Sequence, residues 1–314
     1  MYLRVLFLAI LLFAATAFSA EIDSFTRRNS ILVPDATSRI NNYVNQKLKR
    51  AVLELNRADF ECPTDHRYAV GAYKVIKSNL SSRFFGHTIA VDLKRKLPPS
   101  VKIVTPLNKS IYRYITHWQG ISLKIKGLMP TVEIGKNIIG LDKLGHFFVE
   151  GWGFYKRANL RENGSIFNAI KWGRRTEAGY FGLVTTGVFS HADLVANFNG
   201  MRFWNQLLMF NPDPIDQTIT PILNCENGNW SIERTFDFSD FVDPAMDEGI
   251  NCNFYRSKKI QQHVSDKIID NYRLLSLFSR SFSFCPIYRK RCLGLSEKYG
   301  DYANLLLHPT CLEK

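Results

Sequence analysis

An apolar stretch over residues 140–204 carries ionisable side chains at helical spacing. Charged groups are rarely buried alone, because leaving water costs free energy that only a partner offsets. Helices that carry such groups on an apolar background are therefore expected to bring them together when they pack. The stretch contains three predicted helices. The polar residues expected to meet between them are Asp142, Lys143, His146, Glu177, Asp193 and Asn197.

The first of these helices is expected to begin at Asp142 and to continue to about residue 160. Asp142, His146 and Glu150 are four residues apart, so they fall close to one face of the helix. Lys143 lies three residues before His146, near the same edge. The spacing therefore predicts that a histidine, a lysine and two carboxylates share one side of this helix.

The other two helices can add to the same cluster. Glu177 belongs to the second predicted helix, over 166–184. In the third helix Asp193 and Asn197 are four residues apart. Gly200 follows on the same side, where the missing side chain would let a neighbouring backbone approach. Packing of the three helices would give a carboxylate–lysine–histidine–amide cluster within an aromatic shell.

Such a cluster suits three kinds of chemistry. A histidine between carboxylates can act as a general acid or base, because its pKa lies near neutrality. Histidine and carboxylates also bind zinc or manganese, so a divalent metal is the candidate cofactor. Lysine and arginine together can bind a phosphate. The candidates for catalysis or metal binding are His146, Asp142, Glu177 and Asp193, and those for substrate binding are Lys143, Asn197, Arg174 and Ser190, with Arg175 as the alternative to Arg174.

Each of these residues also has a structural interpretation. Ser190 and Asp193 fit the capping-box pattern, in which the first residue caps the helix that holds the second. Asp142 could likewise cap its own helix after Gly140. A single histidine on an aromatic face, such as His146, is more often a satisfied core residue than a ligand. The whole cluster can therefore be a buried structural network instead of a functional site.

The chain as a whole predicts a mainly helical protein, with a helical core, small β hairpins and disulfides. Apolar residues recur at helical spacing over 37–55, whereas alternation of β-branched residues over 88–93 predicts a strand. Asn227-Gly228 is a strong hairpin signal. The other expected elements are helices over 66–79, 110–118, 190–209 and 260–278, a short strand over 101–104, and hairpins over 131–140 and 219–235.

Residues 1–20 have the features of a signal peptide, namely Arg4, an apolar run and then small residues. An uncleaved N-terminal anchor is the alternative. No repeat or linker interrupts residues 21–314, so one mainly helical domain is expected. Within it, 131–210 is the candidate site region and 211–314 is a part rich in hairpins and disulfides. The leader predicts an exported protein, either periplasmic or secreted.

Six cysteines follow the predicted leader, and an even number in an exported chain predicts disulfides. Six cysteines allow 15 pairings, among which the sequence cannot choose. Proximity along the chain favours Cys285 with Cys292 and Cys225 with Cys252, which would leave Cys62 with Cys311. Free buried thiols are the alternative. The spacings do not indicate a zinc site.

The chain is strongly basic, with a formal charge of +13 that becomes +12 without the leader's Arg4. In an exported protein this charge favours an anionic membrane surface or a cell-wall polymer as partner, and disfavours nucleic acid. One segment is acidic but lacks the EF-hand spacing, so we expect a solvated turn with a helix cap there. Its residues are Asp237, Asp240, Asp243, Asp247 and Glu248.

The polar pattern resembles that of the VanZ-like proteins and related bacterial envelope families of unknown function. The resemblance covers about 60 of the 314 residues, and it implies that the polar set is a shared functional or structural core. The segment 247–252 and the run 177–204 look like uncharacterised exported bacterial proteins. The matching pattern is Asp142-Lys143-x-x-His146, then Glu177, then Asp193-x-x-x-Asn197-x-x-Gly200.

Two functions are consistent with these observations. The first is an enzyme of the cell envelope that acts on an anionic lipid-linked or wall-derived substrate. In it His146 would transfer protons, Asp142 and Asp193 would orient it or share a metal, and Lys143 would hold the anion. The second is a non-catalytic binding or scaffold protein of the envelope, whose polar cluster is structural and whose basic surface contacts membrane or wall.

Overall fold

The computed structural model describes residues 21–28, 34–81, 89–179, 182–272 and 284–312. The predicted leader therefore lies outside the described residues. The fold is mainly helical with small antiparallel strand pairs, as the sequence predicts. The helices are α2 (Thr37–Arg57), α3 (Val70–Leu80), α4 (Ile89–Lys96), α5 (Ile121–Lys126), α6 (Asp142–Gly145), α7 (Gly151–Asn159), α8 (Ile166–Ala178), α9 (His191–Gln206), α10 (Lys258–Asn271), α12 (Leu295–Tyr299) and α13 (Ala303–Leu306).

The strands form three separate two-stranded pairs. Two of them are the hairpins that the sequence predicts, whereas β3 pairs with the distant β6. That long-range pair joins the start of α9 to the segment that follows the acidic residues. The strands are β1 (Thr131–Ile134), β2 (Asn137–Gly140), β3 (Val188–Ser190), β4 (Leu223–Glu226), β5 (Asn229–Ile232) and β6 (Asn253–Tyr255).

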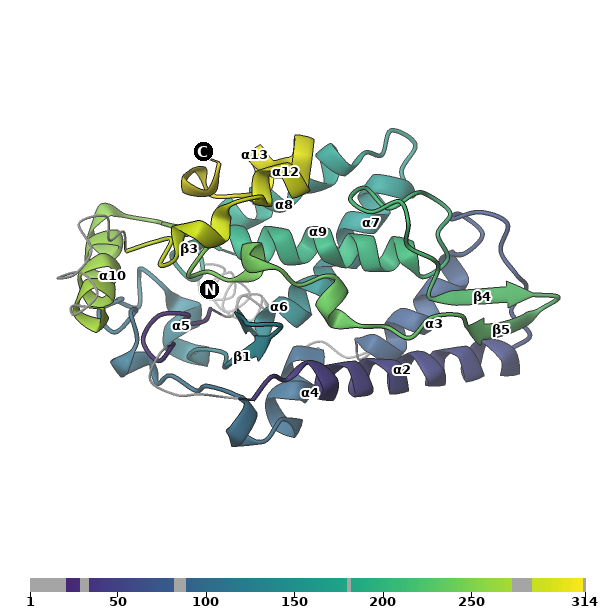
Figure 1. Cartoon of the computed structure of the whole chain (residues 1–314), viewed down its shortest axis with the longest axis horizontal. Coiled ribbons are helices and arrows are strands. Elements are labelled where there is room, and N and C mark those ends of the chain that lie inside the picture. Colours follow the sequence, from purple (N-terminus) through teal and green to yellow (C-terminus); the bar gives the residue numbers. More distant parts are fainter. Residues whose placement is uncertain (1–20, 29–33, 82–88, 180–181, 273–283, 313–314) are drawn as a thin grey trace, which may run out of the picture.

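Helix α9 runs through the centre of the molecule, and all 16 of its residues are buried. A helix that is covered on every side belongs to the core, so its polar residues must find partners inside the protein. It packs against α7, α8, α13 and η3, a π-helical turn over His146–Glu150 that connects α6 to α7 (Figure 1). The predicted helix from Asp142 is therefore one continuous path, α6–η3–α7, with a wider turn in its middle.

Two glycines allow this path to cross α9 with the backbones in contact. A Cβ atom at Gly200 would lie 1.9 Å from the carbonyl oxygen of Phe147, and one at Gly151 would lie 2.6 Å from the backbone of Gly200. The expectation that Gly200 admits a neighbouring backbone is confirmed. Next to the crossing, the indole of Trp204 donates a hydrogen bond to the carbonyl oxygen of Phe148 at 3.1 Å. A side chain of α9 thus satisfies a carbonyl group of the π-helical turn.

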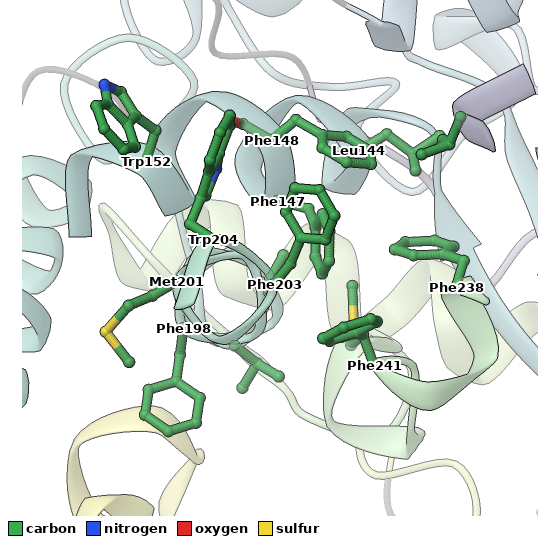
Figure 2. Close-up of a cluster of buried hydrophobic side chains, with 14 of the residues drawn as sticks. Leu144, Phe147, Phe148, Trp152, Phe198, Met201, Phe203, Trp204, Phe238 and Phe241 are labelled. Atoms are coloured by element: carbon green, nitrogen blue, oxygen red, sulfur yellow. The ribbon is translucent and has the colours of Figure 1, made fainter. Parts of the chain in front are cut away.

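Aromatic side chains surround this crossing (Figure 2). Phe147 and Phe203 face each other with ring centroids 5.5 Å apart, and Trp152 lies 5.0 Å from Trp204. Phe238 and Phe241, from the segment after β5, close the cluster near Phe147. Aromatic side chains bury large areas, so this cluster fixes how α9 packs against η3 and α7.

All six cysteines form disulfides, but none of the pairings that proximity favoured is present. The bonds join Cys62 to Cys225, Cys252 to Cys285 and Cys292 to Cys311. The first attaches the loop after α2 to β4. Distant segments come together in the fold, so closeness in space decides which cysteines pair, and closeness along the chain does not.

Several local predictions were wrong. Residues 89–96 form α4 instead of a strand, because Ile89, Ala90 and Leu93 bury one helical face in the core. Residues 110–118 form turns instead of a helix. Of the strand expected over 101–104, only Ile103 pairs with another segment, at Thr131. Helix α8 ends at Ala178, before the expected residue 184, and part of the helix expected up to residue 278 lies outside the described residues.

No helix among the described residues is both long and apolar enough to cross a bilayer.

The crossing at Gly200 gives a first testable prediction. Gly200→Ala should lower the free energy of unfolding by about 1–3 kcal/mol or more, because the backbone of Phe147 must move away from the added methyl group. Gly153→Ala is the matched control, since a Cβ there would make ordinary contacts at 3.6 Å with Trp172. Alanine should gain about 1 kcal/mol of helix propensity at position 153. Thermal unfolding measures both, and similar Tm values for the two variants would contradict the close crossing.

Candidate functional site

The side chain of Lys143 is the centre of the polar cluster. Its ammonium nitrogen, Nζ, lies 3.1 Å from Asp142 Oδ2, 2.6 Å from Asp193 Oδ1 and 2.6 Å from Glu248 Oε1. The lysine side chain is 0% exposed, and the three carboxylates are at most 5% exposed. One buried cation is therefore shared by three carboxylates from α6, α9 and the segment before β6.

Local structure positions two of these carboxylates. Ser190 caps α9, since its hydroxyl oxygen accepts a hydrogen bond from the amide of Asp193 at 3.1 Å. The same hydroxyl donates to Glu248 Oε1 at 3.2 Å. The capping interpretation of Ser190 is thus confirmed, and the cap also contacts the cluster. The suggestion that Asp142 caps α6 was wrong, because Leu141 holds the cap position and Asp142 accepts from the amide of Lys143.

His146 lies at the edge of the cluster, with 13% of its side chain exposed. Its Nε2 atom is 3.3 Å from Asp193 Oδ2. With the amide nitrogen of Asn197 turned toward the ring, Asn197 donates to His146 Nδ1 at 3.1 Å and to the carbonyl oxygens of His146 and Asp193 at 3.3 Å. This network assigns the ring proton to Nε2, facing the aspartate. Both ring nitrogens therefore have partners within the protein.

Two further carboxylates lie around this core. Glu177, from α8, accepts a hydrogen bond at Oε1 from the amide of Ser190 at 3.1 Å. Glu21, near the start of the described chain, is 1% exposed and interacts electrostatically with Glu248, Asp193 and Glu177. The cluster thus contains five carboxylates and one lysine, and this excess of acidic groups determines how it titrates.

Burial raises the pKa values of several of these carboxyl groups above their ordinary range. Burial and the repulsion from neighbouring carboxylates raise the pKa of Glu21 and of Glu177 well above 4.5. Burial also raises the pKa of Asp142, and it raises that of Glu248 to about 7, although the attraction of Lys143 opposes both shifts. For Lys143, burial acts to lower the pKa, but the surrounding carboxylates outweigh it and hold the pKa well above 10.5. The surroundings therefore favour the charged form of the lysine, and they favour protonation of the carboxyl groups more than water does.

The predicted site residues do not all meet. Asp142, Lys143, His146, Glu177, Ser190, Asp193 and Asn197 form one connected network. Arg174 instead donates to the carbonyl oxygen of Leu305 at 2.7 Å and lies over the ring of Phe189. Its alternative, Arg175, lines a separate basic pocket, and Glu150 is partly exposed. The expected contact of Lys143 with an arginine around a phosphate is not present.

The expectation of a solvated acidic turn was wrong for three of its five residues, because Asp243, Asp247 and Glu248 are buried. Asp247 is 0% exposed and pairs with Arg28 through two hydrogen bonds, and Glu248 is 1% exposed. The helix-cap part of the expectation is confirmed, since Asp237 and Asp243 cap short helical turns. Sequence reasoning therefore missed Glu248 and Glu21 as members of the cluster. The available signal was the position of Glu248 beside Ile250 and Cys252, which are both buried.

The geometry does not fit a metal ion in the cluster. Carboxylate oxygens of Asp142, Asp193 and Glu248 lie within 4.8 Å of one another, which is close enough for a shared cation. The ammonium of Lys143 already occupies that position at 2.6–3.1 Å from each of them. Two of the metal ligands proposed from the sequence, His146 and Glu177, are not part of this group. A lysine charge therefore replaces the charge that a metal would supply.

Comparisons with protein families, with curated proteins and with solved structures gave no match to this chain.

Treatment with a chelator tests whether Lys143, and not a metal ion, supplies the central positive charge of the cluster. Because Lys143 supplies the central cation, treatment of the purified protein with a chelator should leave Tm unchanged, and elemental analysis should find no stoichiometric zinc or manganese. A fall in Tm that added zinc or manganese reverses would show instead that these carboxylates bind a metal.

The titration of Glu248 gives a second prediction. Its pKa is about 7 in the folded protein against an ordinary value of 4.5, so the folded state binds more protons between these values. Its contribution to stability therefore falls as pH rises through this window. Glu248→Gln cannot ionise, so the stability of the variant relative to the unsubstituted protein should rise by about 1 kcal/mol or more from about pH 5 to about pH 8.

Urea unfolding of both proteins at the two pH values measures this difference. The other ionisable groups are the same in the two proteins, so their contribution cancels in the comparison. Glu226→Gln, at an exposed carboxylate on β4, is the control and should show no such change. A relative stability of Glu248→Gln that falls with pH would mean that the fold favours the ionised carboxylate.

Proposed function

We propose that this protein is an exported, non-catalytic binding protein of the cell envelope that docks on an anionic membrane surface, and that its lysine-centred cluster is structural. The observation that carries the proposal is a surface near α5 on which exposed aromatic and aliphatic side chains lie among basic residues. We call it the α5 surface. Its exposed apolar residues are Tyr114, Trp118, Ile125 and Val184.

The apolar side chains of the α5 surface are unusually exposed. Trp118 is 88% exposed, Ile125 is 70% exposed, and Tyr114 and Val184 are each 55% exposed. Tryptophan and tyrosine favour the interface between lipid and water, because each combines an apolar ring with a polar group. Single exposed apolar residues need no explanation, but four in adjoining segments favour an interaction surface.

Contacts between the segments support one continuous surface. The amide of Ser122, in α5, donates to the carbonyl oxygen of Thr185, the neighbour of Val184, at 3.0 Å. Arg256 donates to the carbonyl oxygen of Trp118 at 3.2 Å. The ring of Tyr114 lies 5.3 Å from that of His263 on α10. The four apolar side chains therefore project from segments that pack against one another.

The charge of this region complements an anionic surface. Residues 93–132 contain eight lysines and arginines and no aspartate or glutamate. Arg113, Lys124 and Lys126 belong to this segment and flank the apolar residues, and Arg256 adds a further cation. Each basic residue near an anionic bilayer contributes about 1 kcal/mol of attraction, so several of them with apolar anchors suffice for binding.

The buried cluster supports a structural role better than an enzymatic one. Lys143 is 0% exposed, so no substrate reaches it without a rearrangement of the core. Both ring nitrogens of His146 have partners in the protein, so it lacks a free atom for proton transfer. The enzyme hypothesis would need one of these contacts to break. A network that joins α6, α9 and the segment before β6 is sufficient to explain the cluster.

The disulfides support export. Their three bonds use all six cysteines, and such bonds persist in oxidising compartments such as the periplasm or the exterior of the cell.

Vesicle binding tests the proposal. The protein should co-sediment with vesicles that contain phosphatidylglycerol, should not co-sediment with phosphatidylcholine vesicles, and should be released as salt rises from about 0.05 M to about 0.5 M. The double variant Trp118→Ala/Ile125→Ser should bind at least tenfold more weakly, because it loses two apolar anchors that together contribute about 1.5 kcal/mol or more.

Tyr68→Ala is the matched control, because Tyr68 is 74% exposed and lies in the turn before α3, a helix on the opposite side of the molecule from α5 (Figure 1). It should bind as the unsubstituted protein does. Equal weakening by both changes, or binding that ignores lipid charge and salt, would reject the α5 surface as the docking site.

A further inference from the structure

We infer that a second surface, separate from the α5 surface, is a binding site for a phosphate group that carries two or more negative charges. The site is a pocket of about 420 Å³ between the end of α7, the turn after it and α8. We call it the α7–α8 pocket. Its lining residues are Arg157, Arg161, Asn163, Asn168, Lys171, Trp172 and Arg175.

Positive charge is concentrated in this pocket. Four of the seven lining residues are lysine or arginine, and none of the seven is acidic. Across the described residues, none of these four cations forms an ion pair with a carboxylate within 4 Å. Glu150 acts on Arg157 from a greater distance and offsets only part of the charge. Four cations without close counter-charges favour an anionic ligand.

Arg157 is held in place inside the pocket. Its guanidinium group lies 3.4 Å from the ring centroid of Trp172, and its Nη1 atom donates to the carbonyl oxygen of Gly153 at 3.1 Å. Its Nε atom is buried and has no hydrogen-bond partner. A guanidinium that is already fixed in this way is suited to an oxyanion, because little conformational entropy is lost on binding.

The start of α8 adds to the same field. The helix has 13 residues and is capped by Ser165, whose hydroxyl accepts from the amide of Asn168. The Asn168 side chain donates to the carbonyl oxygen of Asn163, so both lining asparagines lie at this end of the helix. The amino end of a helix carries partial positive charge and stabilises anions.

The composition of the pocket defines the class of ligand. Trp172 is its only aromatic residue, and the guanidinium of Arg157 already covers that ring, so the pocket recognises charge and hydrogen-bond acceptors. Planar guanidinium groups match phosphate oxygens, and two or more arginines match a doubly charged group. Pyrophosphate, a phosphomonoester and the terminal phosphate of a lipid or polymer share this chemistry. The site lies apart from the α5 surface, since α5 is at the left of the molecule and α7 lies right of its centre (Figure 1).

Calorimetric titration of the full chain with inorganic pyrophosphate, at constant ionic strength, tests the inference. We expect one saturable site, with weaker binding of singly charged anions such as chloride. Arg161→Gln/Lys171→Gln should weaken pyrophosphate binding at least tenfold, because it removes two exposed cations from the pocket. Both side chains are on the surface, so the Tm should not change.

The matched control is Lys49→Gln/Arg50→Gln, which removes one lysine and one arginine from the exposed face of α2. It lowers the net charge by the same amount and should change pyrophosphate binding less than twofold. Equal weakening by the two double variants would mean that net charge alone attracts the anion. That result, or the lack of saturable binding, would overturn the inference.

A competition experiment identifies the source of the phosphate. If vesicles that contain phosphatidic acid displace pyrophosphate in proportion to the lipid, the ligand is a lipid headgroup. If pyrophosphate binds equally well with and without these vesicles, the ligand is a soluble or polymer-borne phosphate. Either result upholds the pocket, and neither depends on whether the α5 surface docks on a membrane.

Discussion

One buried ammonium group, that of Lys143, connects the parts of this molecule that lie far apart in sequence. Its three carboxylate partners come from α6, α9 and the segment before β6. A buried charge without partners costs several kcal/mol, so each partner is needed where the fold places it. Burial raises the pKa of Glu248 and of Glu177, so these carboxylates take up protons more readily than they would in water. The cluster therefore couples the packing of the core to pH.

The path that carries this lysine, α6–η3–α7, crosses α9 with the two backbones in contact. Gly200 and Gly151 remove the side chains that would separate the two segments. The wider π-helical turn then leaves carbonyl groups that Trp204 and Asn197 satisfy. The ion pairs near the start of α9 and the aromatic cluster further along the helix thus both stabilise the crossing.

The surface has two separate basic regions with different chemistry. The α5 surface combines cations with exposed aromatic and aliphatic side chains, which suits the interface of a bilayer. The α7–α8 pocket holds cations around a fixed arginine, which suits a compact polyanion.

Sequence alone determined the helical class, the cysteines' use in disulfides, the cap at Ser190 and most members of the cluster, because these follow from local spacing and from the cost of burying charge. It could not determine which distant segment completes the cluster. Glu248 lies among acidic residues that look solvated, and only the pairing of β6 with β3 brings it to Lys143. The disulfide pairs and the separation of Arg174 and Arg175 from the cluster were likewise decided by tertiary structure. Contacts between residues far apart in sequence depend on how whole elements pack, and no local pattern records that packing.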